Sequence, residues 1–270
     1  MTNAPVTNAR TDRFFNFPVT ILIFASFMLG MSEFVVVGIL PDIASGLKIS
    51  EVTVGNLVAL FAFVYAPCTP IGSALSARFP RFATYLILMG VFLVGNILCA
   101  LAPNYPVLLI ARLLIASVSG TLVAISMTFA PDVTTDKYRT KFIAWVFSGF
   151  SIASVVGVPI GTWVANTFGW RVTFYLVSVL TAVLMISMAL VLPRNSHPAK
   201  IGFLRQFRLF FDRRIQLGVL DVVCGAAASY VFYTYLSPIM RDEIGVPEQY
   251  LSIGPVSYTH LRAHETSQDL

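Results

Sequence analysis

Charged residues are scarce in this sequence. The 18 Lys and Arg and the 13 Asp and Glu make up 11% of its 270 residues, whereas 57% are apolar. Soluble domains contain about 25% charged and about 45–50% apolar residues. The composition therefore excludes an ordinary soluble globular protein. The net charge of +5 does not indicate nucleic acid as a partner, because most cations fall in short loops between apolar runs.

Cysteine and histidine are also few. The three cysteines lie inside apolar runs, which predicts structural thiols and no disulfide framework: Cys68, Cys99 and Cys224. Only His197 lies outside a C-terminal tail discussed below, so neither a metal nor another cofactor is expected. HExxH, GxSxG and paired membrane aspartates are absent, as are channel filter repeats. The sequence therefore offers no catalytic residues, and we do not expect an enzyme.

Long uncharged runs dominate what is present. Seven stretches of 19 to 30 residues lack Asp, Glu, Lys and Arg: 14–32, 52–77, 82–111, 113–131, 142–170, 172–193 and 222–240. A membrane helix needs about 20 apolar residues. With Pro and Gly as end signals, we predict spans near 18–40, 52–76, 83–102, 107–130, 142–165, 172–192 and 216–240. The first is too long for a cleavable signal peptide, whose apolar region is about 7–15 residues.

The distribution of Lys and Arg predicts the orientation. Thirteen of the 18 lie in segments on the same side as the N-terminus, and three, Lys48, Arg171 and Arg241, lie in segments on the other side. The positive-inside rule therefore predicts a multi-pass membrane protein with a cytoplasmic N-terminus.

A hydrophilic stretch, residues 193–215, separates the sixth and seventh spans. It holds six cations and one acid, and its Phe and Leu residues interleave with arginines. This pattern is typical of an amphipathic helix lying in the headgroup layer. A binding site for a soluble partner is the alternative.

Three ionisable residues lie at membrane depth: Glu33, Arg112 and Asp221. Each costs at least about 2.5–3.5 kcal/mol on insertion scales, and so requires a reason. Glu33 and Arg112 lie eight and six residues from prolines at the outer ends of their helices, or roughly 9–12 Å deep. They are predicted to pair, either as a proton relay or as a permanent structural ion pair. Asp221, near the inner end of the seventh span, either lines a cavity or reaches the headgroups.

Small residues repeat every four positions in the fifth span, and Pro159 lies between two of them: Gly149, Ala153, Gly157, Gly161 and Ala165. This spacing favours close helix packing, and the proline predicts a kink. Ala116, Gly120, Ala124 and Thr128 continue the spacing from Arg112, which places the arginine toward protein or water. Arg78 and Arg81, after the second span, are predicted to anchor in headgroups or to cap helix C-termini.

These motifs together resemble the major facilitator superfamily. The resemblance covers about residues 15–254 and is nearest to the arabinose-efflux-permease-like members of the twelve-span drug–proton antiporter group. It rests on SEFVVVGILPDIA with Glu33, ARLLIASVSG with Arg112, GFSIASVVGVPIG from Gly149 to Gly161, and FGWR from Phe168. It implies an all-α membrane protein with the N-terminal six-helix bundle, made of two inverted three-helix repeats, plus the seventh transmembrane helix.

The loop after the second span departs from this family pattern. The family places an acid before the arginine and a glycine two residues after it, but here Ala77 precedes Arg78 and Pro80 follows. A conformational latch that uses the acid is therefore not expected in this chain.

The resemblance and the spans predict the domain organisation. Residues 1–192 form the six-helix bundle, 193–215 the linker, and 216–255 the first helix of a truncated second bundle. The last segment, 256–270, contains VSYTHLRAHET, which resembles a translated sequencing-library adaptor, and it is expected to be non-native.

The resemblance also implies a function. We expect the intact protein to be a monomeric, proton-coupled exporter of small organic molecules in a bacterial inner membrane, with Glu33 carrying the proton. The alternatives are a facilitator or symporter of the same fold, or a nonfunctional membrane fragment. The substrate is not predicted, although aromatic residues such as Phe61, Tyr65, Phe147 and Tyr235 are candidates to stack on its rings.

Overall fold

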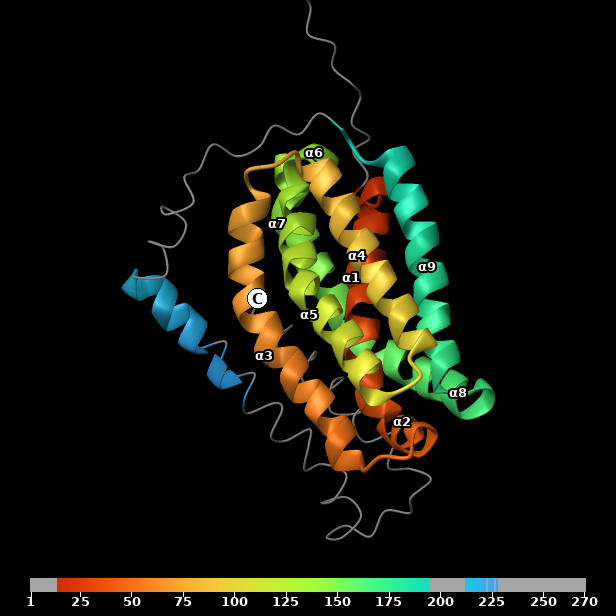
Figure 1. Ribbon diagram of the computed structural model, residues 1–270. Coiled ribbons are helices and arrows are strands. Elements are labelled where there is room, and N and C mark those ends of the chain that lie inside the picture. Colours follow the sequence, from red (N-terminus) through yellow and green to blue (C-terminus); the bar gives the residue numbers. More distant parts are fainter. Residues whose placement is uncertain (1–13, 195–211, 222, 226, 228–270) are drawn as a thin grey trace, which may run out of the picture. The chain divides into compact units, whose positions relative to one another are not determined.

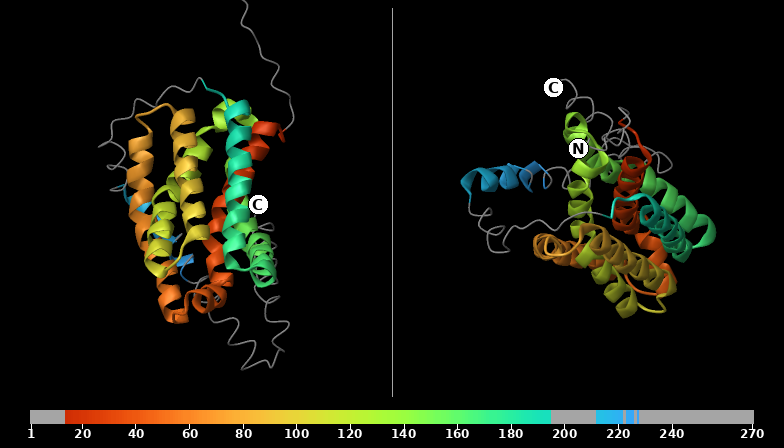
Figure 2. Two further views of the ribbon diagram at one scale, coloured as in Figure 1. Left: turned by 45° about the vertical axis from the view of Figure 1, so that its right-hand side comes forward. Right: turned by 90° about the horizontal axis from the view of Figure 1, so that it is seen from above.

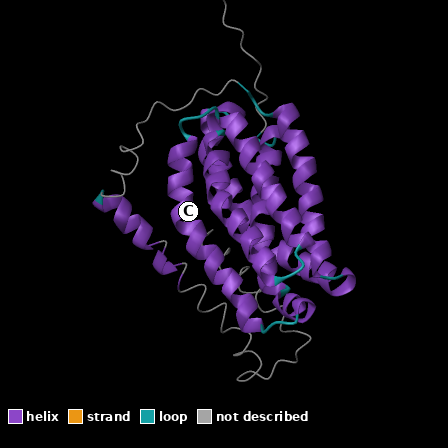
Figure 3. Cartoon of the chain, in the orientation of Figure 1, coloured by secondary structure: helices purple, strands orange, loops and turns teal. Residues whose placement is uncertain are grey.

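The computed structural model describes residues 14–194, 212–221, 223–225 and 227, and within them it contains helices and turns but no strand (Figures 1 and 3). The chain divides into two compact units, Met1–Lys200 and Ile201–Leu270, each described here by itself. The helices of the first unit are α1 (Phe17–Gly38), α2 (Leu40–Leu47), α3 (Glu51–Ser76), α4 (Arg81–Leu101), α5 (Tyr105–Thr128), α6 (Ala130–Val133), η1 (Asp136–Tyr138), α7 (Arg139–Ile152), η2 (Ala153–Gly157), α8 (Val158–Phe168) and α9 (Trp170–Val191).

Short polar side chains begin three of the long helices. Asn16, Ser50 and Asn104 each accept a hydrogen bond from the backbone N–H three residues later. Such caps satisfy donors that have no partner within the helix. The sequence therefore marks the starts of α1, α3 and α5 through local contacts.

Six segments of the described chain are long and apolar enough to cross a membrane: α1, α3, α4, α5, Asp136–Phe168 and α9. They confirm the six spans predicted between residues 18 and 192, with ends shifted by a few residues. The eight-residue helix α2 was not predicted. It begins where the backbone of Ile39 leaves the α-helical region, and Pro41 and Asp42 in its first turn are favourable at a helix N-terminus.

The fifth span consists of three segments. Between α7 and α8, residues Ala153–Gly157 form a π-helical turn, and the N–H of Val158 donates to the carbonyl of Ala153. Pro159 then lies in the first turn of α8, where its missing N–H costs least. The irregularity expected from the proline is thus a π-turn that precedes it.

The helices of the first unit pack around α1 and α5 (Figures 1 and 2). α5 contacts α3 and α4, α4 also contacts α9, and α1 contacts α7, α8 and α9. In the most apolar window of each span, 61% of the residues are buried in α1 and in α5, but only 17% in α3 and 22% in Asp136–Phe168. α1 and α5 are therefore the elements best placed to bury polar side chains.

In the second unit, residues 213–221 are helical and exposed. They include the start of the predicted seventh span. Most of that span, most of the predicted linker 193–215 and the whole tail 256–270 lie outside the described residues.

Candidate functional site

Arg112 lies at the centre of the first unit. It projects from α5 and is only 1% exposed. Its Nη1 donates a hydrogen bond of 2.7 Å to the backbone carbonyl of Ser32, and its Nη2 lies 3.4 Å from the carbonyl oxygen of Glu33. The guanidinium therefore holds the middle of α1 through main-chain oxygens.

Ser32 extends this contact to a third helix. Its hydroxyl donates to the side-chain oxygen of Asn96 at 2.7 Å, and the Asn96 amide nitrogen donates to the carbonyl of Phe92 at 2.8 Å. Ser32 and Asn96 are both fully buried. A polar layer consequently joins α1, α4 and α5 in an otherwise apolar core.

An aromatic ring completes the surroundings of Arg112. The guanidinium carbon lies 4.4 Å from the ring centre of Phe61 on α3, a residue that is 3% exposed. Phe61 in turn stacks on Tyr65 at 5.9 Å. A cation facing an aromatic ring is stabilised electrostatically, the more so where water is excluded. Phe61 is therefore a partner of Arg112, and its role as a candidate for substrate stacking stays a prediction.

The predicted ion pair between Glu33 and Arg112 does not form among the described residues. The two residues are neighbours, but Arg112 contacts the backbone of Glu33 and not its carboxylate. One carboxylate oxygen of Glu33 is buried without a hydrogen-bond partner, and so is Nε of Arg112. The physical reason is that the backbone carbonyls of α1 lie closer to the guanidinium and accept its hydrogen bonds, so the carboxylate forms no direct ion pair with it.

The glycines of the fifth span bring its backbone against α1. A Cβ on Gly149 would lie 2.7 Å from the carbonyl oxygen of Ile23, and one on Gly157 would lie 3.2 Å from Met31. A Cβ on Gly161 would collide with Val35. These contacts lie along α1 from Ile23 to Val35. The glycines therefore let the fifth span approach α1 closely, and an added methyl group would clash at Gly149 and Gly161.

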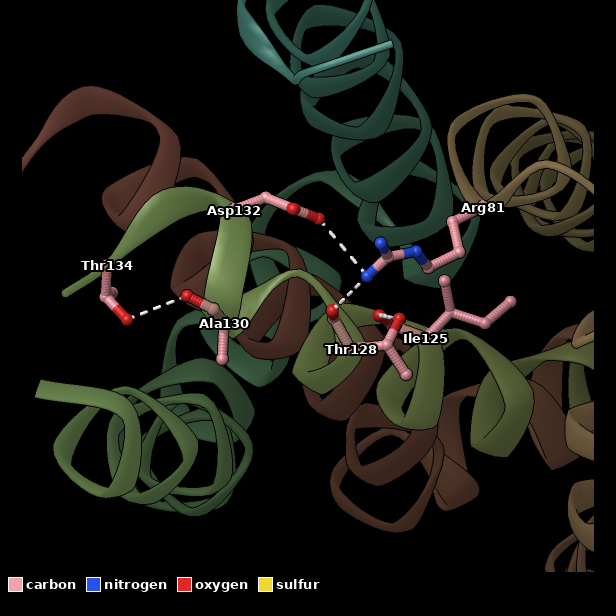
Figure 4. A network of polar contacts seen from close by, with 6 residues as sticks. All are labelled: Arg81, Ile125, Thr128, Ala130, Asp132 and Thr134. Carbon is pink, nitrogen blue, oxygen red and sulfur yellow. Dashed lines mark hydrogen bonds and ion pairs between the residues drawn. The ribbon is translucent and has the colours of Figure 1, made fainter. Parts of the chain in front are cut away.

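Arg81 forms a separate polar network near the start of α4 (Figure 4). Its Nη1 lies 3.2 Å from a carboxylate oxygen of Asp132 in α6 and also donates to the carbonyl of Thr128 at the end of α5. Arg81 thus contacts the last residue of α5, and the choice between capping and headgroup anchoring stays a prediction for the two arginines. Asp132 was not singled out from the sequence. A signal was available, because this acid follows the fourth span closely and the predicted loop on the same side of the membrane holds two arginines.

The other predicted residues lie elsewhere in the described chain. Arg78 lies in the turn between α3 and α4, and Pro159 lies in α8. Asp221 is an exposed helical residue of the second unit and is described apart from the first. The described residues contain no group of three side chains suited to hold a metal ion.

Comparison with known proteins identifies the class of this helical chain. The sequence profile of the Major Facilitator Superfamily matches residues 22–259, which include the first residues of the tail expected to be non-native. The chain belongs to the Major Facilitator Superfamily. This membership confirms the predicted family and fold, a multi-pass membrane protein of a transporter family, and the expectation that the chain is not an enzyme.

Several curated relatives are about 30% identical to this chain over the aligned residues. It is 31% identical to the uncharacterized MFS-type transporter YbcL of Bacillus subtilis, over 87% of this chain and 60% of that protein. It is 29% identical to the inner membrane transport protein YdhP of Escherichia coli, over 84% and 58%. The chloramphenicol resistance protein of Streptomyces lividans is 29% identical, over 89% and 62%. The chain thus spans about 60% of the length of these relatives.

Solved structures agree on the fold. A bacterial homolog of the human lysosomal transporter Spinster, in an inward-facing and unoccupied conformation, superposes with a TM-score of 0.63 at 19% identity, over 90% of this chain and 58% of that one. The peptide transporter POT in complex with sulfate gives 0.60 at 15% identity, over 82% and 46%.

Proposed function

We propose that this chain is part of a proton-coupled exporter of small organic molecules that works by alternating access, with Glu33 as the residue that takes up and releases the proton. The observation that carries the proposal is the state of the Glu33 carboxylate. It lies at membrane depth beside a buried arginine, yet one of its oxygens has no hydrogen-bond partner. A carboxylate held by a direct salt bridge would resist protonation, and Glu33 forms no such bridge within the described residues.

In this proposal Arg112 is a positioning residue. Its hydrogen bonds to the carbonyls of Ser32 and Glu33 do not depend on the charge of the carboxylate. Protonation of Glu33 therefore changes the electrostatic field around α1 without breaking the contact that holds α1 to α5. Such an arrangement lets the proton bias the bundle between two states while its packing stays intact.

The substrate class is proposed from the names of relatives. One is a chloramphenicol resistance protein, and another, 28% identical, is a probable sugar efflux transporter of Mannheimia succiniciproducens. A small drug, sugar or related metabolite fits both. Substrate would bind between this bundle and a second one, near the membrane midplane.

The orientation and location belong to the same proposal. The excess of Lys and Arg on the N-terminal side supports a cytoplasmic N-terminus, and the name of the Escherichia coli relative supports an inner membrane. A single cysteine introduced at exposed Lys137 should resist membrane-impermeant thiol reagents in intact cells, whereas one at Lys48 should react. Labelling of the cysteine at position 137 but not of the one at position 48 would show that the N-terminus lies on the opposite side of the membrane.

The test of proton coupling uses the complete product of the source gene, read through its 3′ end, in proteoliposomes with an imposed pH gradient. We expect Glu33→Gln to abolish gradient-driven uphill transport and to retain counterflow exchange, because exchange needs no net proton movement. Glu51→Gln is the matched control, since Glu51 is an exposed acid in the first turn of α3. Uphill transport by the Glu33 variant at the wild-type rate would remove Glu33 from the mechanism.

A facilitator or symporter of the same fold is the second candidate. It is favoured by one observation, that the Arg112–Ser32–Asn96 layer is complete without the carboxylate and so can be purely structural. In that case downhill flux would persist without a pH gradient, or substrate and protons would move in the same direction. If the reading frame stopped at Leu270, the nonfunctional fragment would become the preferred alternative.

A further inference from the structure

An aromatic–lysine cluster lies where α1 begins and α7 begins. It consists of Phe14, Phe15, Lys137, Tyr138, Lys141 and Trp145. Phe14 contacts Phe15 and Tyr138 with ring centres 4.8 and 5.7 Å apart, and Phe15 contacts Trp145 at 5.3 Å. The Asn16 side chain fixes this end of α1 by donating to the carbonyl of Val133 at 2.7 Å. The cluster thus consists of side chains that pack against one another where the starts of the two helices meet.

The two lysines of the cluster are held over its rings. Nζ of Lys141 lies 4.7 Å from the ring centre of Phe14, and Nζ of Lys137 lies 5.3 Å from that of Tyr138. Both lysines are exposed, and neither forms an ion pair within the described part of the chain. The neighbouring acid, Asp136, is occupied by Arg139 at 2.7 Å. The cluster therefore carries two ammonium groups that no acid of the described residues pairs with.

Below the lysines, the surface of α7 becomes apolar. Lys141, Trp145 and Ile152 are separated by four and seven residues and so lie on one face of the helix. Ser148 lies on this face too, and its hydroxyl donates to the carbonyl of Ala144 within the helix. Ile152 is 40% exposed. At 1.5 Å per residue the face is about 16 Å long, which is close to half of the roughly 30 Å hydrocarbon core. A cationic end, an aromatic belt and an apolar strip one leaflet deep match the parts of a phospholipid.

We infer that this face binds an anionic phospholipid, with its phosphate between Lys137 and Lys141 and an acyl chain along Trp145 and Ile152. The charge of the cluster selects an anionic headgroup over a zwitterionic one. The apolar strip selects a lipid over a soluble phosphate. The inference needs neither the proton-coupling role of Glu33 nor a particular orientation of the bundle.

The test reconstitutes the 270-residue chain in phosphatidylcholine nanodiscs that contain a minor fraction of brominated lipid. The signal is the quenching of Trp145 fluorescence, obtained by subtracting the Trp145→Phe variant, because the sequence has two other tryptophans. We expect brominated phosphatidylglycerol to quench more strongly than brominated phosphatidylcholine at equal mole fraction. Lys137→Gln and Lys141→Gln should each lower this preference about five-fold, since each Lys near a membrane surface contributes about that factor.

Matched variants separate this site from general charge effects. Lys48→Gln removes an exposed lysine elsewhere, and Arg194→Gln removes a cation that also lies over a ring, Phe82 at 5.7 Å. Both variants should keep the preference for phosphatidylglycerol. Lys141→Arg, which retains the positive charge, should keep it too, and this variant tests the charge even if Lys141→Gln perturbs folding. Equal quenching by the two lipids, or an unchanged preference in the double glutamine variant, would overturn the inference. Displacement of phosphatidylglycerol by millimolar glycerol phosphate would instead indicate a site for a soluble anion, and would overturn it too.

Discussion

Arg112 and Arg81 make similar contacts in very different surroundings. Each donates to a backbone carbonyl of another helix, Arg112 to Ser32 in α1 and Arg81 to Thr128 at the end of α5. Arg112 is 1% exposed and forms no ion pair within the described chain, whereas the side chain of Arg81 is 25% exposed and pairs with Asp132. The buried arginine thus relies on the main chain, and the accessible one also uses an acid.

The difference follows from what each environment tolerates. A buried cation that loses its partner destabilises the fold, because nothing in the low-dielectric interior replaces the hydration that the cation gave up on burial. A carbonyl cannot be protonated, so Arg112 keeps its acceptors whatever the charge of Glu33. Near the end of a helix, water can replace a lost acid, and an ion pair there contributes at most about 1 kcal/mol. The comparison therefore supports a structural role for Arg112, and the proposal that Glu33 carries the change of charge is compatible with it.

Removing the buried arginine should give the largest effect. Arg112→Ala deletes hydrogen bonds from a charged donor and leaves a cavity beside Phe61, so we expect the free energy of unfolding to fall by about 3 kcal/mol or more. Denaturant unfolding of the 270-residue chain in detergent, followed by circular dichroism, measures it. Arg112→Lys should recover part of the loss, because one ammonium reaches fewer acceptors. A loss below about 1 kcal/mol would show that the α1 contact is not structural.

The accessible pair should give a smaller effect. In a double-mutant cycle of Arg81→Gln and Asp132→Asn, we expect a coupling of about 0.5–1 kcal/mol that weakens as salt is raised. The more exposed pair of Arg139 and Asp136, with side chains 47% and 87% exposed, is the matched control and should give less. A coupling free energy of several kcal/mol between Arg81 and Asp132 would show that this accessible pair behaves like a buried one. The inferred difference between Arg81 and Arg112 would then be wrong.

The sequence predicts much of this arrangement, for reasons that particular residues show. Glu33 and Arg112 stand out because charges within long apolar runs are rare, and their distances from Pro41 and Pro106 place them at one depth. That Arg112 binds the backbone of α1 and not the carboxylate could not be predicted, because backbone carbonyls are available at every helical position and leave no pattern. The hydrogen bond between the side chains of Ser32 and Asn96 was missed for a different reason, because two polar residues 64 positions apart carry no sequence signal that they meet.

Neutralising Glu33 should have the smallest effect on stability and separates the two interpretations of the pair. If the carboxylate held Arg112 directly, Glu33→Gln would leave a buried cation unpaired and cost about 3–5 kcal/mol. Because the guanidinium bonds to the carbonyls of Ser32 and Glu33, we expect the free energy of unfolding to change by less than about 1 kcal/mol, measured as for Arg112→Ala. Glu51→Gln controls for loss of an acid elsewhere. A large loss for Glu33→Gln would mean that the carboxylate is a structural partner, and its freedom to exchange a proton would have to be abandoned.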